Sequence, residues 1–336
     1  MRCWLSDRLN IVLVLTVLCL YHSMAFSASK SVLRRRFIVD TDVGVDDLVA
    51  IRSLLLHLNQ EQQQDNVLLS TVHGISETHV GSSYLQRVFP HLTVLESPLI
   101  PPQAKATVPA WLTGYRAGLD KVLKELPTTS LAARPIEHSF ESLYAFLRNS
   151  PHDDSVTLLC LGPLSNVAEW HKQQGPLLEE KLSEIWILGG NDPRDKEQTP
   201  EFNLAQDANA SHQVFGSSLA SKIRLVLASE TSLDKLPQAV AQIKEYVIDK
   251  SGLLARLLQF RPYDGCCDPM AAFAVNHVDS AATYSPSLIS VDADTGLLSS
   301  ATGHFISLVQ DIQVDTGYLP WLRKAIDLDE AEEIAS

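Results

Sequence analysis

The sequence predicts an α/β fold in which a mainly parallel sheet carries helices on both faces. Short apolar runs alternate along the chain with segments whose apolar residues recur at helical spacing, which is the order of strand–helix units. With 336 residues, of which 45% are hydrophobic and 20% charged, the chain can build a large core. No internal repeat or low-complexity linker interrupts this order, so we expect a single domain over residues 37–330.

The first element is a buried strand at residues 37–39, and a helix follows it at once. The apolar residues that give this helix its spacing are Leu48, Ile51, Leu55 and Leu58. Further strands are expected at 67–72, 156–161, 185–188 and 223–227, and further helices near 166–171 and at 207–215 and 237–248. Ligands of parallel sheets bind at the carboxyl ends of the strands, so the polar residues that follow these strands are the candidates for a site.

The N-terminus has the layout of a secretory signal peptide. Its apolar run, residues 11–21, is shorter than the ~20 residues that a membrane span needs. Ser23 and Ala25 then offer small side chains at the two positions that a signal peptidase reads. An uncleaved anchor remains the alternative, because more positive charge follows the run than precedes it. We predict a signal peptide over residues 1–25, a lead-in segment over 26–36, and a secreted protein with no membrane attachment after cleavage.

The charge balance limits the partners. Lys and Arg number 27 and Asp and Glu number 40, which gives a net charge of −13. A surplus of this sign argues against a nucleic-acid partner and leaves metal cations and neutral small molecules open. The five cysteines are too few and too scattered for a disulfide scaffold.

Four carboxylates lie within eight residues after the first strand. Asp40 and Asp42 end the strand and Asp46 and Asp47 begin the helix, while Gly44 allows the chain to turn tightly between the two pairs. Without a cation these groups would repel one another, and a hard divalent cation prefers oxygen ligands of this kind. Helix capping would explain Asp46 or Asp47 but not the pair at the strand end. The pattern therefore favours a metal or catalytic site.

Three further motifs come after later strands. Residues 161–166 (LGPLSN), taken alone, indicate a turn that enters a helix. Residues 201–203 (EFN), which follow two glycines, are either a solvated loop or a carboxylate and an amide that bind sugar hydroxyls. Within residues 266–269 (CCDP), Asp268 either caps the next helix or is a further ligand for the same cation.

The order and spacing of DTDVGVDD, GPLSN, GG…EFN and CCDP resemble those of the nucleoside hydrolases, the calcium-dependent N-ribohydrolases of the inosine-uridine-preferring type. The resemblance runs from about Phe37 to the C-terminus and is weakest over residues 75–135. It implies a Rossmann-like core and an enzyme that hydrolyses the N-glycosidic bond of ribonucleosides to free base and ribose. It also implies a nucleoside as the small-molecule partner and a homodimer or homotetramer.

The same resemblance implies how a Ca²⁺ ion would be held. Its ligands would be Asp42, Asp47, Asp268 and the backbone carbonyl of Leu161, and Asp40 would support the cluster. A Ca²⁺-bound water would be the nucleophile and Asp42 its general base, an arrangement that places the attacking oxygen beside a carboxylate.

The implied substrate contacts lie on three side chains. Asp46 would bond the ribose 2′-hydroxyl, Asn203 the 3′-hydroxyl and Glu201 the 5′-hydroxyl. Cys267 stands where the family often has the His proposed as acid for the leaving base, and a neutral thiol is a weak donor. The sequence therefore leaves open both the leaving-group acid and the base preference.

Two other positions depart from the family pattern. Val43 stands where Pro is usual before Gly44 and suggests a minor backbone change. Ile75 stands where Asn usually follows Gly74, which removes one polar contact near the ribose.

Two other functions remain alternatives. The first is a secreted nucleoside-binding or ribose-binding relative with reduced or lost catalysis, which Ile75 and Cys267 favour. The second is a phosphatase of the haloacid-dehalogenase type, whose first strand also ends in Asp-x-Asp. That class does not account for Asp46 and Asp47 or for the later EFN and CDP elements.

Overall fold

The computed structural model describes residues 35–58, 66–100, 109–125, 133–151, 153, 155–231, 235–277 and 282–335. Contacts group Arg36–Ser336 into one compact unit. The predicted signal peptide, residues 1–25, lies outside the described residues. Among the residues that are described, no helix combines the length and the apolar character that a membrane crossing requires.

Nine strands of the described chain form one sheet, in the order β4-β3-β2-β1-β5-β6-β7-β9-β8. They are β1 (Arg36–Thr41), β2 (Val67–Thr71), β3 (Thr93–Glu96), β4 (Ile136–Glu137), β5 (Val156–Cys160), β6 (Leu182–Leu188), β7 (Ile223–Val226), β8 (Thr283–Val291) and β9 (Leu298–Gln310). Every neighbouring pair is parallel except β8 and β9, which form an antiparallel hairpin at one edge. The predicted mainly parallel α/β fold is therefore confirmed.

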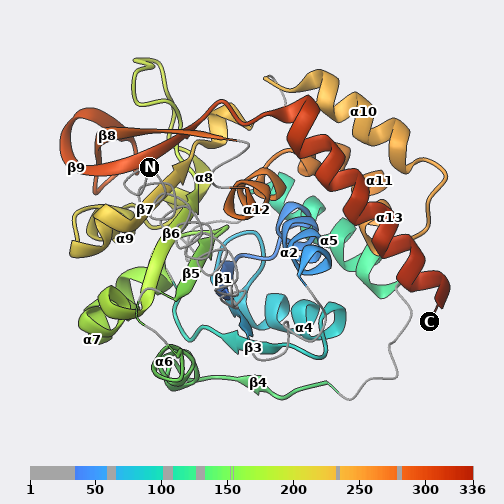
Figure 1. Cartoon of the computed structure of the whole chain (residues 1–336), viewed down its shortest axis with the longest axis horizontal. Helices are drawn as coiled ribbons and strands as arrows, with labels where there is room; N and C mark the ends of the chain where they lie inside the picture. The colour runs from blue at the N-terminus through green and yellow to red at the C-terminus, as the bar shows by residue number, and fades with distance from the viewer. Residues whose placement is uncertain are drawn as a thin grey trace, which may run out of the picture. The chain divides into compact units, whose positions relative to one another are not determined.

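Helices cover both faces of the sheet (Figure 1). The α-helices are α2 (Val45–His57), α4 (Thr78–Val88), α5 (Ala110–Lys124), α6 (Glu141–Arg148), α7 (Ser165–Lys181), α8 (Phe202–Gln206), α9 (Ala208–Phe215), α10 (Pro237–Val247), α11 (Leu253–Phe260), α12 (Asp268–Asn276) and α13 (Leu319–Ala335). Side chains alternate between the faces of a strand, so Phe37 and Val39 of β1 pack with α2 and α12, while Ile38 packs with α6 and α7. Both layers are apolar, which explains why the strands appear in the sequence as continuous apolar runs.

The chain reverses its direction of travel across the sheet between β1 and β5. Strands β1 to β4 follow one another toward one edge, whereas β5 to β7 proceed toward the other. The connections after β1 and β5 therefore diverge at the carboxyl ends of these two strands, which is where ligands bind in sheets of this kind. Asp42 follows directly on β1, and Leu161 follows directly on β5.

Some elements differ from the sequence-based expectation. The sequence predicts no strand at β3, at β4 or in the β8–β9 hairpin, because β3 and β4 are short and β8 is largely half-exposed, so none of these segments has a long apolar run. Arg36, the last residue of the predicted lead-in, begins β1 and is buried. Its guanidinium donates to Phe146 O at 2.9 Å and lies 3.8 Å from the Phe146 ring centroid, so this end of the lead-in is part of the folded sheet and its charge is held by a carbonyl and an aromatic ring.

Candidate active site

The turn after β1 is fixed by hydrogen bonds to Asp47. One oxygen of this carboxylate accepts from the Thr41 hydroxyl, and the other accepts from Gly44 N at 2.8 Å. Gly44 is the N-cap residue of α2, so Asp47 satisfies one of the amides that every helix start leaves unpaired. Asp47 therefore caps the start of α2, and it does so from within the group of four carboxylates that follows β1.

Val43 takes a backbone conformation that β-branched residues rarely adopt. Its φ is +58°, in the left-handed region, although its side chain is fully buried. A proline ring holds φ near −65° and cannot reach this conformation. Val43 thus allows a turn conformation that a proline at this position would exclude, and the size of the backbone change relative to the family pattern stays a prediction.

Carboxylates from two distant segments meet beside this turn. Asp46 and Asp47 of α2 and Asp268 of α12 each present an oxygen, and these oxygens all lie within 4.8 Å of one another. Asp268 is the first residue of α12 and follows the N-cap residue, Cys267, so Asp268 does not hold the capping position of that helix. The packing of α12 on α2 therefore brings Asp268 to the cluster, and the capping interpretation of this residue is not supported.

Burial makes the negative charges of these groups costly. Burial, followed by the neighbouring carboxylates Asp47, Asp46 and Asp42, raises the pKa of Asp268 well above its usual value. Burial and the Asp47 charge likewise raise the pKa of Asp42. A divalent cation would offset this repulsion, because it favours the ionised form of every carboxylate around it. We refer to Asp42, Asp46, Asp47 and Asp268 as the acidic cluster.

Asp42 is held from the loop after β2. Its Oδ2 accepts from Ile75 N at 2.8 Å, and Ser76 N donates to the Asp42 carbonyl at 2.8 Å. Two glycines make room for it: a Cβ on Gly74 would lie 2.1 Å from Asp42 Oδ2, and a Cβ on Gly162 would lie 3.0 Å from Asp42 Cβ. Ile75 thus contributes its backbone amide to the site, whatever polar contact its side chain lacks.

Asn166 connects the ends of neighbouring strands beneath the cluster. Its Nδ2 donates to Asp40 Oδ1 at 2.8 Å and to Thr71 O at 3.0 Å, and its Oδ1 accepts from the Ser97 hydroxyl. The other oxygen of Asp40 is buried without a hydrogen-bond partner. The LGPLSN motif therefore does more than turn the chain, which the sequence analysis did not foresee for Asn166. The one signal was the recurrence of polar residues after strand ends.

The residues expected to contact the ribose lie near Leu161. Asn203 Nδ2 donates to Leu161 O at 3.2 Å and to Leu188 O at 3.3 Å, so the EFN segment joins the ends of β5 and β6. Glu201 is the N-cap residue of α8, and its carboxylate accepts from Gly190 N, Asn203 N and Leu204 N. Burial raises the pKa of Glu201 above its usual value, and the hydrogen bonds from these backbone amides offset only part of that rise. Glu201 therefore has a structural role in the loop, and its contact with the ribose 5′-hydroxyl stays a prediction.

Cys267 lies at the edge of the cluster. It is half-buried, its Sγ is 4.0 Å from Thr231 O, and burial together with Asp46 and Asp268 raises the pKa of its thiol well above the usual value. The sulfur is therefore a neutral thiol at pH 7, beside the predicted ribose contact Asp46.

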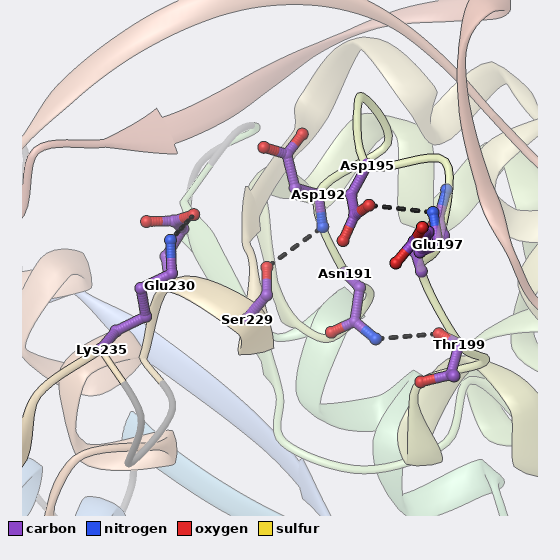
Figure 2. A pocket seen from close by; sticks show the side chains of 9 residues that line it. Asn191, Asp192, Asp195, Glu197, Thr199, Ser229, Glu230 and Lys235 are labelled. Carbon is purple, nitrogen blue, oxygen red and sulfur yellow. Dashed lines mark hydrogen bonds and ion pairs between the residues drawn. The ribbon is translucent and has the colours of Figure 1, made fainter.

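A pocket of about 270 Å³ lies beside the site, at the carboxyl ends of β6 and β7 (Figure 2). The bond from Asp192 N to the Ser229 hydroxyl, 3.1 Å long, joins the two segments that line the pocket, and the bond from Asn191 Nδ2 to Thr199 O, 2.8 Å long, joins the two ends of the first segment. It is lined by Asn191, Asp192, Asp195, Glu197, Gln198, Thr199, Ser229, Glu230 and Lys235. None of the acidic-cluster residues is among them. The pocket adjoins the site through Gly190, whose amide donates to Glu201 and whose carbonyl accepts from Ala228 N.

Exchanging Gly74 for alanine is expected to displace Asp42 and to weaken divalent-cation binding roughly tenfold or more, the equivalent of about 1.4 kcal/mol. The added Cβ would lie 2.1 Å from Asp42 Oδ2 and 2.7 Å from Asp42 Cβ, so the side chain has to move. Isothermal titration calorimetry with Ca²⁺ measures the effect. Gly114→Ala is the matched control, because a Cβ there meets nothing within 4 Å. Equal affinities for the two variants would contradict the crowding.

Comparison with known proteins shows what the chain is similar to. Residues 37–318 match the family model described as "Inosine-uridine preferring nucleoside hydrolase". The non-specific ribonucleoside hydrolase RihC of Escherichia fergusonii is 28% identical over 191 residues, and that of Escherichia coli O139:H28 is 30% identical over 198 residues. Each alignment covers 56% of this chain and 60% of the relative, so the chain spans less than two thirds of the length of these curated relatives.

Solved structures share the fold. The inosine-uridine preferring nucleoside hydrolase of Bacillus anthracis superposes with a TM-score of 0.65 at 18% identity, covering 88% of this chain and 99% of that one. The purine-preferring ribonucleoside hydrolase of Gardnerella vaginalis gives a TM-score of 0.66 at 14% identity, covering 88% and 100%. At these identities the likeness establishes the fold.

Proposed function

Because this chain belongs to the inosine-uridine preferring nucleoside hydrolase family, we propose that it hydrolyses the N-glycosidic bond of ribonucleosides and releases a free base and ribose. The predicted family is thereby confirmed, and it is a family of hydrolases. The observation that supports the activity best is the meeting of Asp46, Asp47 and Asp268 beside the end of β1. A phosphatase of the haloacid-dehalogenase type would not need a carboxylate on α12.

We propose Ca²⁺ as the cofactor. The groups at the carboxyl ends of β1 and β5 are oxygen ligands, namely the carboxylates of the acidic cluster and the Leu161 carbonyl, and such sets suit hard cations with many ligands. The raised pKa values of Asp42 and Asp268 fit a site built for a cation, since both groups are costly to ionise without one. When bound, the ion would supply Lewis-acid polarisation of a water molecule and of the ribose diol.

Different side chains would serve proton transfer and ribose binding. Asp42 would take the proton of the attacking water, with the Ile75 amide holding its Oδ2 in place. Asp46 and Asn203 would bind the 2′- and 3′-hydroxyls, and Glu201 the 5′-hydroxyl. Binding the ribose at several hydroxyls directs binding energy toward distortion of the sugar into an oxocarbenium-like transition state.

The test is base release by the purified mature protein. Inosine, adenosine, guanosine and uridine are incubated with Ca²⁺ or with a chelator, and the reducing sugar is measured. We expect sugar from at least one nucleoside in Ca²⁺, none in chelator, and recovery when Ca²⁺ is restored. Nucleoside binding without sugar release would favour the non-catalytic relative, and phosphate release from a nucleotide would favour the phosphatase.

Exchanging Cys267 for histidine is expected to raise kcat on uridine by roughly 10²-fold, the lower end of what a positioned general acid contributes. Pyrimidine bases leave poorly without a proton, and the neutral thiol of Cys267 is a weak donor. Steady-state kinetics on uridine and inosine measure the change. Cys266→Ala, which alters the adjacent buried thiol, should leave the uridine rate unchanged. An unaltered uridine rate in Cys267→His would argue that this position does not serve the leaving base.

We also propose that the protein is secreted after cleavage of residues 1–25 and that it assembles as a homodimer or homotetramer. The layout of the N-terminal sequence supports secretion, and the resemblance to the family supports assembly. N-terminal sequencing of the protein from culture medium and analytical ultracentrifugation of the mature chain test the two statements.

A further inference from the structure

Two consecutive residues of α5 reach two different loops of the site. The Tyr115 hydroxyl accepts from Val45 N at 2.7 Å and donates to Asp264 Oδ2 at 3.1 Å. Arg261 secures the far end, because its Nε donates to Asp264 Oδ2 at 2.8 Å and its guanidinium lies 4.4 Å from the Tyr115 ring centroid. Tyr115 is thus bonded to the first residue of α2, next to Asp46.

Crowding at Gly44 shows how close this phenol is to the acidic cluster. A Cβ on Gly44 would lie 2.6 Å from Asp46 Oδ1, 3.0 Å from Asp47 Oδ2 and 3.1 Å from the Tyr115 hydroxyl oxygen. The three oxygens therefore all lie on the side of Gly44 where a side chain would project. The bond from Val45 N to the Tyr115 hydroxyl therefore holds the chain directly between Gly44 and Asp46.

Arg116 acts on the loop after β2. Its Nε donates to Ile75 O and its second amino group donates to Gly74 O at 3.1 Å, while Glu77 lies 3.7 Å from the guanidinium. The Ile75 amide is the group that donates to Asp42 Oδ2 at 2.8 Å. Arg116 thus fixes, through Gly74 and Ile75, the loop that holds the predicted general base.

We propose that Tyr115 and Arg116 are positioning residues of the active site, Tyr115 for Asp46 and Arg116 for Asp42. The inference rests on the proposed function for the roles of the two aspartates, but the contacts themselves do not depend on it. Asp46 is assigned to the ribose and Asp42 to the attacking water. The hydrogen bonds of Tyr115 and those of Arg116 should therefore affect different kinetic constants. Loss of the Tyr115 hydroxyl weakens substrate binding, whereas loss of the Arg116 fork lowers the rate of the chemical step.

For Tyr115, the experiment is Tyr115→Phe beside Tyr84→Phe. Each variant removes one phenol hydroxyl that donates to an aspartate, and Tyr84 donates to Asp120 Oδ1 at 3.2 Å, away from the acidic cluster. In Tyr115→Phe we expect KM for the best nucleoside to rise about tenfold while kcat changes less than twofold. Tyr84→Phe should match the wild type. A fall in kcat at constant KM, or equal effects of the two variants, would overturn the assignment.

For Arg116, the experiment compares Arg116→Gln and Arg116→Lys with Arg87→Gln. Arg87 also donates to a backbone carbonyl, that of Lys124 at 3.3 Å, but outside the site. We expect Arg116→Gln to lower kcat at least tenfold with little change in KM, and Arg116→Lys to recover part of it, because lysine keeps the charge but not the fork that spans two carbonyls. Arg87→Gln should match the wild type. A rise in KM at constant kcat in Arg116→Gln, or no kinetic change, would refute the role of Arg116.

A third readout separates this inference from the proposed function. If the wild type releases no base, crystal structures of Tyr115→Phe and Arg116→Gln decide the matter. A displaced Asp46 in the first variant and an Asp42 that has lost its bond to Ile75 N in the second support the positioning roles. Aspartates in unchanged positions overturn them. Calorimetry with Ca²⁺ on Arg116→Gln should in addition show an affinity reduced about tenfold, whether or not the protein turns over.

Discussion

Replacing Asp42 by asparagine is expected to lower kcat for base release by about 10²–10⁴-fold, the range that a general base contributes. The amide cannot take a proton from the attacking water, and it no longer offers an anionic ligand to the cation. The asparagine side-chain oxygen can still accept from Ile75 N, which donates at 2.8 Å, so the loop should keep its conformation. Steady-state kinetics at saturating nucleoside and Ca²⁺ measure the loss.

Two controls test whether a lower rate comes from unfolding or from the loss of any carboxylate. Far-UV circular dichroism and the thermal midpoint of Asp42→Asn in chelator should show an intact fold. Asp120→Asn, at an exposed carboxylate of α5, should retain the wild-type rate. A variant at residue 42 that keeps more than a tenth of the wild-type kcat would remove Asp42 from the role of general base.

Removal of the cation is expected to destabilise the protein progressively as the pH rises from about 4 to about 7. Burial raises the pKa of Asp40 from 3.8 to about 7, and burial with like charges raises the pKa values of Asp42, Asp46 and Asp268 well above 3.8. Above pH 4 the unfolded chain has released these protons while the folded chain still holds them. Stability therefore falls as pH rises until the folded groups also ionise, and Asp40 alone contributes about 4 kcal/mol to that fall.

Ca²⁺ should reverse this trend. A bound cation favours the ionised carboxylates, and a ligand at 1,000 times its Kd adds about 4 kcal/mol to the free energy of unfolding. Urea unfolding at pH 5, 6, 7 and 8, with chelator and with Ca²⁺, gives the two curves. Asp40→Asn should flatten the curve in chelator, because it removes one titrating group while keeping an oxygen for Asn166 Nδ2. Parallel curves with and without Ca²⁺ would contradict the linkage between the cation and these carboxylates.

The sequence alone determined those features that depend on residues near one another in the chain. Apolar runs at β1, β2, β5, β6 and β7 predicted buried strands, because both faces of a central parallel strand must be apolar. The Asp-rich turn predicted a cation site, since four carboxylates in eight residues repel one another without a cation. Strands β3 and β4 were not predicted because they are short, and the β8–β9 hairpin was not predicted because a half-exposed strand lacks the continuous apolar signal.

Only the tertiary structure decided which distant groups meet. The packing of α12 on α2 places Asp268 against Asp46 and Asp47, and the placing of α5 beside two site loops gives Tyr115 and Arg116 their partners. No spacing in the sequence marks such pairs, because a side chain's neighbours across a core are set by how helices and strands stack and not by their separation along the chain. Local patterns in the sequence thus specified which chemical groups form the site, and the packing of helices and strands specified which other residues hold those groups in position.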